Sequence, residues 1–214
     1  MKRQSDRAKL IETEYLAEFG LKPQFILGAI DYLYDVLDRI DTTLQDAGSD
    51  RLSQLLELAN LSAIVGNLFR RGITRTSKGA FIQNKPHTYP DLIGVAEGSK
   101  DIEIKVALET NKPKGHLVKP GPHVTLRYVL ADQDGNYRRG RENRGDVVWV
   151  WEIRTGILDD SHFRVSNTEG DSGKTAVISA DGMDALEVAY CDILRCPHSP
   201  SRRRYQDLEK LYSR

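Results

Sequence analysis

The sequence lacks any run of eighteen apolar residues, the length at which a segment becomes a candidate transmembrane helix. Its first residues, MKRQSDRAKL, also lack the apolar stretch of a secretory signal peptide. These absences predict a cytoplasmic protein. The sequence has only two cysteines, Cys191 and Cys196, which a reducing cytosol would keep as thiols. A zinc site formed by both cysteines and His198 is an alternative, but it lacks the second ligand pair of typical zinc spacings.

The chain also lacks a net charge, since it carries 31 basic and 31 acidic residues, and this balance argues against a nucleic-acid partner. The distribution along the chain is nevertheless uneven. Residues 61–144 carry 15 basic and 8 acidic groups, whereas the flanking segments 1–60 and 145–214 are acidic. A phosphate-binding cleft in a neutral protein would produce such a basic block, although surface solvation alone would produce it too.

A length of 214 residues, with 39% hydrophobic and 29% charged residues, predicts one domain over residues 1–214. Its N-terminal part, 1–71, has apolar residues at helical spacing, which predicts helices at about 5–19, 23–46 and 50–71. The second helix has a narrow apolar seam: Ile26, Ile30, Leu33, Leu37, Ile40 and Leu44. Such a seam packs against another helix of the same domain or, alternatively, joins two subunits.

After Gly72 the sequence changes to short apolar or alternating runs separated by turn residues, a pattern typical of strands and hairpins. We expect a sheet-rich core over 72–170, with strands near 80–83, 90–96, 101–107, 123–131, 146–154 and 162–166. Trp149 and Trp151 lie in a run that is apolar on both faces, which predicts a strand buried in the sheet. The C-terminal part, 171–214, is predicted to form helices near 182–195 and 203–213. The expected fold class is therefore α/β, of the α+β kind.

Two carboxylates and an amine fall on neighbouring predicted strands. Asp91 opens one strand, Glu103 and Lys105 lie in the next, and a glycine-containing turn separates them. A hairpin of this kind places Asp91 opposite Glu103, and residues two apart, such as Glu103 and Lys105, project from the same face. In phosphodiester hydrolysis the carboxylates and the Ile104 carbonyl would hold Mg²⁺, and Lys105 would orient the attacking water. The alternative is a structural hairpin in which Glu103 and Lys105 form a surface pair.

The pattern Pro90-Asp91 followed by Glu103-x-Lys105 resembles the signature of the PD-(D/E)xK nuclease superfamily, which includes type II restriction endonucleases. The resemblance covers at most residues 50–131. It implies a restriction-endonuclease-like fold, in which a central mixed β-sheet is flanked by helices. It also implies that Asp91, Glu103 and Lys105 are the catalytic residues and that Mg²⁺ is the cofactor.

The same resemblance has two consequences for the neighbouring segments. A helix before the motif hairpin often contributes a further acid in this superfamily, and Glu57, the only interior acid of the 50–71 helix, is the candidate third carboxylate for the metal. The superfamily usually has a helix after the lysine-bearing strand. Here that segment, ALETNKPKGHLVKPGPH, contains three prolines and two glycines and is not expected to form a long helix.

Two polar loops carry the side chains that we expect to contact DNA. The first loop would track the phosphate backbone with Lys112, Lys114, His116, Lys119 and His123. The second loop has residue types that also reach guanine and adenine edges: Asn136, Arg138, Arg139, Arg141, Asn143 and Arg144. The alternative is that both loops are solvated surface.

These features predict a Mg²⁺-dependent, site-specific endonuclease that cleaves double-stranded DNA in a restriction system. Symmetric cleavage of a palindrome would suit a homodimer. No P-loop or methyltransferase motif occurs, so the enzyme would act without ATP, and a cognate DNA methyltransferase would be a separate protein. Two alternatives remain open: a structure-specific repair or resolvase nuclease of the same fold, and a non-catalytic DNA-binding protein.

Overall fold

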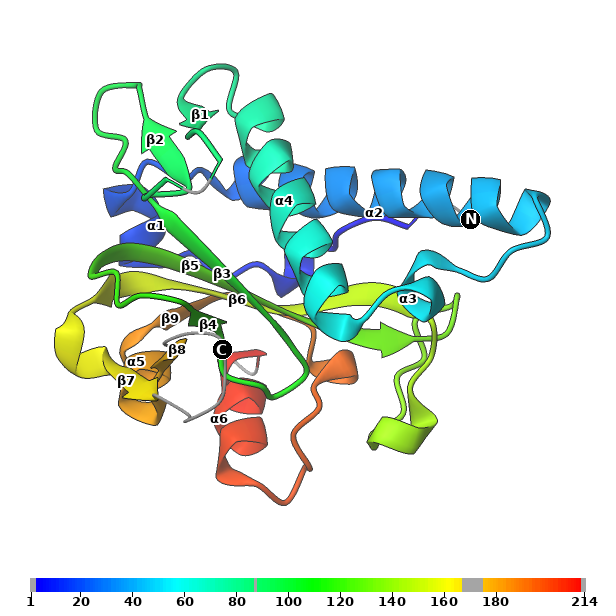
Figure 1. Ribbon diagram of the computed structural model, residues 1–214. Helices are drawn as coiled ribbons and strands as arrows, with labels where there is room; N and C mark the ends of the chain where they lie inside the picture. The colour runs from blue at the N-terminus through cyan, green and yellow to red at the C-terminus, as the bar shows by residue number, and fades with distance from the viewer. Residues whose placement is uncertain (1–2, 87, 167–174, 213–214) are drawn as a thin grey trace.

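The computed structural model describes residues 3–86, 88–166 and 175–212, and it combines helices with β-sheets (Figure 1). The expected α/β character is therefore confirmed. The junction between the expected core and C-terminal parts, residues 167–174, lies outside the described residues, as does position 213 of the last predicted helix. None of the helices within the described ranges has the length and apolar character needed to cross a membrane.

The longest helix, α2 (Pro23–Asp46), has the bounds that the sequence predicted. Pro23 occupies its first turn, where the missing N–H would have no partner inside the helix. Most of the apolar seam is buried: Ile26, Ile30, Leu33 and Leu37. Helix α2 packs against α4 (Leu58–Thr76), and a Cβ on Gly72 would lie only 2.6 Å from the Cα of Ala29. This part of the seam is therefore an intramolecular contact.

Two of the expected helices differ from the prediction. Within 5–19 only α1 (Glu14–Glu18) is α-helical, and Arg7–Lys9 forms a short 3-10 helix. The residues between them run along the sheet, where the Ile11 N–H donates to the Ala189 carbonyl at 2.9 Å. The helix expected at 50–71 is divided into α3 (Leu52–Leu55) and α4, since Leu56 and Glu57 are extended. The Asp41 carboxylate fixes the start of α3 by accepting the Leu52 N–H at 2.9 Å.

The central sheet has the strand order β3-β5-β6-β9 in the described part of the chain. Its strands are β3 (Glu103–Leu108), β5 (Gly121–Ala131), β6 (Val147–Leu158) and β9 (Glu187–Cys191). Strands β3 and β5 are parallel and the other neighbours are antiparallel, so the sheet is mixed. Strand β6 is buried along most of its length, as expected for the run that contains Trp149 and Trp151. Strand β3 lies at the edge of the sheet.

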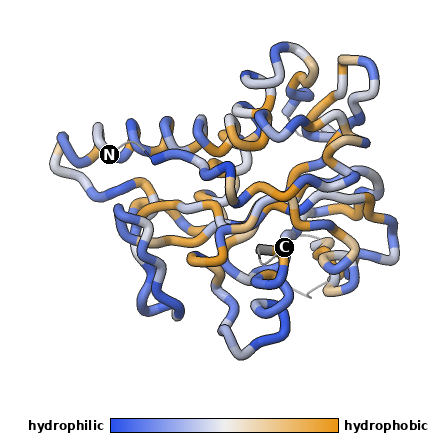
Figure 2. Tube along the Cα trace, turned by 180° about the vertical axis from the view of Figure 1, so that it is seen from behind, coloured by the Kyte–Doolittle hydropathy of each residue, from blue (hydrophilic) through white to orange (hydrophobic). Residues whose placement is uncertain are grey.

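The main hydrophobic core lies between the central sheet and the helix pair α2 and α4. Both helices lie on one side of the sheet, and α5 (Ala180–Ala185) and α6 (Arg203–Tyr212) lie on the other (Figure 1). Hydrophobic residues follow the strands of the sheet, whereas the outer loops and α6 are largely hydrophilic (Figure 2). A smaller core includes Leu158, Phe163 and Met183. The edge strand β3 is thus supported by packing against α4.

Two small sheets complete the described structure. Strands β1 (Phe81–Gln83) and β2 (Leu92–Gly94) pair antiparallel within the segments predicted as strands. The second small sheet has the order β4-β8-β7, formed by β4 (Lys114–Gly115), β8 (Thr175–Ile178) and β7 (Phe163–Ser166). Strand β4 lies in the proline-containing crossover between β3 and β5. This crossover contains no helix in its described residues, as expected.

The C-terminal part is only partly helical. Helix α6 corresponds to the helix predicted at 203–213, but the prediction at 182–195 is wrong over most of its length. Only its beginning belongs to α5, and the segment that follows forms β9. Strand β9 pairs with β6, and its residues Ala189, Tyr190 and Cys191 are all buried. A run of residues that is buried on both faces lacks the alternation of apolar and polar residues by which a strand is distinguished from a helix in the sequence.

Candidate active site

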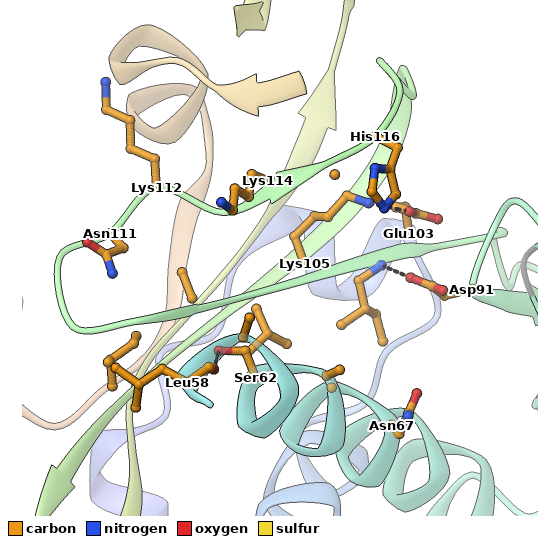
Figure 3. Close-up of a pocket in the computed structure, with 18 of the residues that line it drawn as sticks. Leu58, Ser62, Asn67, Asp91, Glu103, Lys105, Asn111, Lys112, Lys114 and His116 are labelled. Carbon is orange, nitrogen blue, oxygen red and sulfur yellow. Dashed lines mark hydrogen bonds and ion pairs between the residues drawn. The ribbon is translucent and has the colours of Figure 1, made fainter. Parts of the chain in front are cut away.

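The hairpin after α4 brings Asp91, Glu103 and Lys105 together at the start of β3 (Figure 3). Leu92 and Ile102 exchange two backbone hydrogen bonds, of 3.0 and 2.9 Å, and this pairing sets Asp91 beside Glu103. Lys105 projects from the same face of β3 as Glu103, and its Nζ lies 2.6 Å from Glu103 Oε1. The structure therefore places the three motif residues in one site.

The pKa values of the two carboxylates are shifted in opposite directions. Glu103 is only 1% exposed, and burial alone would favour its neutral form, but Lys105 and Lys119 outweigh burial and hold the pKa of Glu103 below its usual range. Lys119 Nζ lies 2.7 Å from the same Oε1 atom. Burial and the charge of Glu103 raise the pKa of Asp91, against the effects of the Ile104 N–H and of Arg70. Glu103 is therefore the more readily ionised member of the pair.

These residues line a cleft of about 830 Å³ between α4 and the crossover that follows β3. Its acidic lining residues are Asp91 and Glu103, and its basic ones are Arg70, Lys105, Lys112, Lys114, His116, Lys119, Arg141 and Arg144. A second cleft of about 840 Å³ shares Asp91, Arg70, Lys105 and Lys119 with the first. The two carboxylates thus lie in a strongly cationic depression.

The helix side of the cleft presents Asn67 and Arg70 instead of an acid. Glu57, the expected third metal carboxylate, is the exposed N-cap residue of α4 and is not among the lining residues. Its expected placement inside a helix that faces the metal is wrong, because the chain is extended at Leu56 and Glu57. Arg70 instead donates from Nη1 to Asp91 Oδ1 and from Nη2 to Asn67 Oδ1.

Arg70 is not among the residues that the motif predicts for the site. Asn67 and Arg70 are three residues apart on the helix before the motif, so they lie on one face of that helix. This spacing of two polar residues is the sequence signal that could have identified Arg70.

The crossover covers Lys105 from the side opposite α4. Strand β4 brings Gly115 so close that a Cβ on this residue would lie 2.9 Å from Lys105 Nζ. Lys119 Nζ lies 5.3 Å from the centre of the Tyr89 ring, and the Tyr89 hydroxyl donates to the Pro120 carbonyl. Tyr89 therefore fixes the part of the crossover that carries Lys119. Neither Gly115 nor Tyr89 belongs to the motif that identified the site.

The expected DNA-contacting residues divide into two groups. The first group lines the cleft: Lys112, Lys114, His116, Lys119, Arg141 and Arg144. Lys112, Lys114 and His116 can be followed in Figure 3 along the crossover. Arg144 also donates two hydrogen bonds of 2.8 Å to the Glu109 carboxylate, which fixes the position of its guanidinium.

The second group does not line either cleft: His123, Asn136, Arg138, Arg139 and Asn143. His123 is fully buried, with Nδ1 2.9 Å from the Gly121 carbonyl oxygen, and position 123 pairs with Glu103 inside the sheet. The expected contact of His123 with DNA is therefore wrong. Arg139 donates to the carbonyls of Cys196 and His198 at 3.0 Å, which ties the second loop to the C-terminal segment.

The side chains of the site could supply only part of the ligands of a metal ion, and waters, substrate oxygens or backbone carbonyls would have to supply the others. In the described part of the chain, no group of three or more His, Cys, Asp or Glu side chains is arranged to hold a metal, and the zinc alternative at Cys191, Cys196 and His198 gains no support. Two carboxylates do fit Mg²⁺, which keeps several waters and takes substrate oxygens as ligands. Glu103 Oε2 is buried without a hydrogen-bond partner among the described residues, and a cation would satisfy it.

The Ile104 peptide group supports the same fit. Its N–H donates to Asp91 Oδ2 at 2.8 Å, so it points away from the paired strand β5. The N–H and the carbonyl of one residue point to the same side of a strand. The Ile104 carbonyl, expected as a ligand, is therefore directed to the outer side of β3, where Asp91 lies.

No model of a protein family matches the chain. A partial similarity exists to the phosphoribosylformylglycinamidine synthase subunit PurL of Metallosphaera sedula, which is 27% identical over 133 residues. The aligned stretch covers 54% of this chain and 18% of that protein, so the chain spans less than a fifth of the length of this relative. A similarity of this extent shows neither a family nor an activity.

Proposed function

We propose that the protein is a Mg²⁺-dependent, site-specific endonuclease that cleaves double-stranded DNA and has the restriction-endonuclease-like fold. The observation that carries the proposal is the meeting of Asp91, Glu103 and Lys105 in a cationic cleft, at the edge of a mixed sheet. Cations along a cleft neutralise the phosphates of DNA, and carboxylates bind the metal that phosphodiester hydrolysis requires.

Each residue of the site has a defined role in this account. Asp91, Glu103 and the Ile104 carbonyl would hold Mg²⁺, which stabilises the charge of the reacting phosphate. Lys105 donates from Nζ, so it orients the attacking water and stabilises the negative charge that develops on the phosphate oxygens. Lys119 binds the same Glu103 oxygen and keeps that carboxylate ionised and in place.

The assembly would follow from the substrate. A palindromic site in double-stranded DNA has two-fold symmetry, which a homodimer matches with two copies of the cleft. Because most of the apolar seam of α2 is buried within the protomer, the dimer contact would lie elsewhere. Protection of the host DNA would require a cognate DNA methyltransferase as a separate protein.

Incubation of the purified protein with plasmid and phage DNA, with and without Mg²⁺, tests the proposal. We expect discrete, reproducible fragments that form only with Mg²⁺. Cutting restricted to branched or damaged DNA would instead indicate a repair or resolvase nuclease with the same site. Binding of DNA without any cutting would indicate a non-catalytic DNA-binding protein.

A further inference from the structure

Arg70 lies where the two clefts meet, one helical turn after Asn67 on α4. Its two terminal nitrogens donate to Asp91 Oδ1 and Asn67 Oδ1. The Arg70 side chain is nevertheless 28% exposed. Two polar partners at the surface of the cleft therefore hold the guanidinium, and a polar ligand that enters the cleft can compete for it.

The two carboxylates differ in whether they have an oxygen without a hydrogen-bond partner. Lys105 and Lys119 both bind Glu103 Oε1, so Oε2 has no hydrogen-bond partner in the described structure. Both oxygens of Asp91 have a hydrogen-bond donor, because Arg70 donates to Oδ1 and the Ile104 N–H donates to Oδ2. The Ile104 N–H is fixed in the backbone of β3. Arg70 is the mobile partner of Asp91, and its positive charge at Oδ1 opposes a cation that binds through the same oxygen.

The local charge leads to the same conclusion. Asp91 and Glu103 contribute two negative charges, and their ion-pair partners Arg70, Lys105 and Lys119 contribute three positive ones. A divalent cation would enter a site that is already positive, and Coulomb repulsion would weaken its binding. Removal of Arg70 from Asp91 leaves the remaining four groups neutral. The divalent cation would then meet less repulsion.

We propose that Arg70 is a phosphate-binding residue that covers Asp91 in the free protein and moves to a backbone phosphate when nucleic acid binds, so that metal and nucleic acid bind cooperatively. The inference rests on the proposed nuclease function. A guanidinium forms paired hydrogen bonds with phosphate as well as with carboxylate. The second cleft also presents Arg71, Lys85 and Lys119, which attract a phosphate to the place where Arg70 lies.

The test measures metal affinity directly, without cleavage. Ca²⁺, which takes oxygen ligands as Mg²⁺ does, is titrated calorimetrically into the protein alone and into its complex with a random-sequence DNA duplex. The variants are Arg70→Gln and, as the matched control, Arg75→Gln. Arg75 lies on the same helix, with its guanidinium 5.2 Å from the centre of the Tyr32 ring, and lines neither cleft.

In the wild type and in Arg75→Gln, DNA is expected to raise the Ca²⁺ affinity by about 10-fold, a typical size for coupling between two sites. Arg70→Gln should bind Ca²⁺ about 10-fold more tightly than the wild type without DNA. DNA should raise its affinity less than it raises that of the wild type, because only the phosphate oxygens then contribute to the gain. Arg70→Met is a second variant that must behave in the same way. Thermal melting of each variant shows that it is folded.

The inference is overturned if both Arg70 variants bind Ca²⁺ no more tightly than Arg75→Gln in the absence of DNA. It is also overturned if they keep the full gain in affinity that DNA gives the wild type. These outcomes are separate from the fate of the nuclease proposal. A protein that cuts no DNA but shows the Arg70 dependence would reject the nuclease alone, and an active nuclease without this dependence would reject only the coupling.

Discussion

Gly115 leaves the space in which the Lys105 ammonium lies, since a Cβ at position 115 would stand 2.9 Å from Lys105 Nζ. Gly115→Ala is therefore expected to displace this ammonium and to slow Mg²⁺-dependent DNA cleavage by about 10- to 100-fold, because a shift of about 1 Å in a positioned group has effects of this size. The melting temperature should change little, since the contact is with the far end of a flexible side chain. Single-turnover cleavage rates and melting curves check both expectations.

Duplex affinity supplies the control for this prediction. It should be unchanged in Gly115→Ala, because the substitution removes no charge from the cleft. Cleavage at the wild-type rate by a folded Gly115→Ala protein would show that the space at Gly115 does not position Lys105.

Glu57→Gln is expected to leave the Mg²⁺ dependence of cleavage unchanged. Glu57 is exposed at the N-cap of α4 and lies outside the cleft, so a change in its charge is screened by water. The measurement is the Mg²⁺ concentration at half the maximal cleavage rate in the variant and in the wild type. A several-fold higher concentration in Glu57→Gln would return this residue to the metal site.

The parts of the structure that the sequence predicted depend on local signals. Helix α2 begins at Pro23 and follows a regular apolar seam, and its bounds agree with the prediction. The motif hairpin combines a turn with two apolar runs, and the pairing of Leu92 with Ile102 places Asp91 beside Glu103 as expected. In both cases a few adjacent residues are sufficient to determine the backbone.

The parts that the sequence did not predict depend on contacts between distant segments. The N-terminal segment is extended because Leu10 pairs with Tyr190, and β9 is a strand because it pairs with β6. At the site, Arg70 and Lys119 reach the motif carboxylates from α4 and from the crossover. No periodicity in the sequence indicates such partners, so the motif identifies Asp91, Glu103 and Lys105 but not the other two cations that bind the carboxylates.

Lys112 and Lys114 line the cleft, and their replacement by alanine should weaken binding to cognate and random duplexes alike. Each phosphate contact removed should also lower the slope of log affinity against log salt by about one. Titrations at several salt concentrations measure both quantities.

Arg139→Ala is the contrasting change outside the cleft. It should leave the salt slope unchanged and lower the melting temperature, because its guanidinium holds the carbonyls of Cys196 and His198. If Arg139→Ala lowers the slope of log affinity against log salt as much as the lysine variants do, the DNA does not follow the cleft alone.

Two histidines make the stability of the metal-free protein depend on pH. Burial is the main reason why the pKa values of His123 and His198 fall from 6.5 to about 4, and Arg127 lowers that of His198 further. Their contribution to stability is fully present above about pH 6.5. As the pH falls towards 4, the unfolded chain takes up protons that the folded chain does not, and stability decreases by up to about 1.4 kcal/mol per pH unit for each histidine.

Denaturant unfolding in EDTA at a series of pH values measures this loss. His123→Phe removes one of these two histidines, so the fall in stability between about pH 6.5 and 5 should be less steep than in the wild type. The absolute stability of the variant is not the test, because the hydrogen bond to Gly121 is also lost. A slope equal to that of the wild type would contradict a neutral, buried His123.

The rate of Mg²⁺-dependent plasmid cleavage by single-site variants tests most directly the claim that Asp91, Glu103 and Lys105 form the catalytic centre. The variants are Asp91→Ala, Glu103→Ala and Lys105→Ala, and the control is Glu97→Ala, which removes an exposed acid from the turn of the same hairpin. We predict cleavage by the wild type and by Glu97→Ala, and none by the other three, which should still bind DNA in Ca²⁺. Cleavage at close to the wild-type rate by any two of those three would contradict the account.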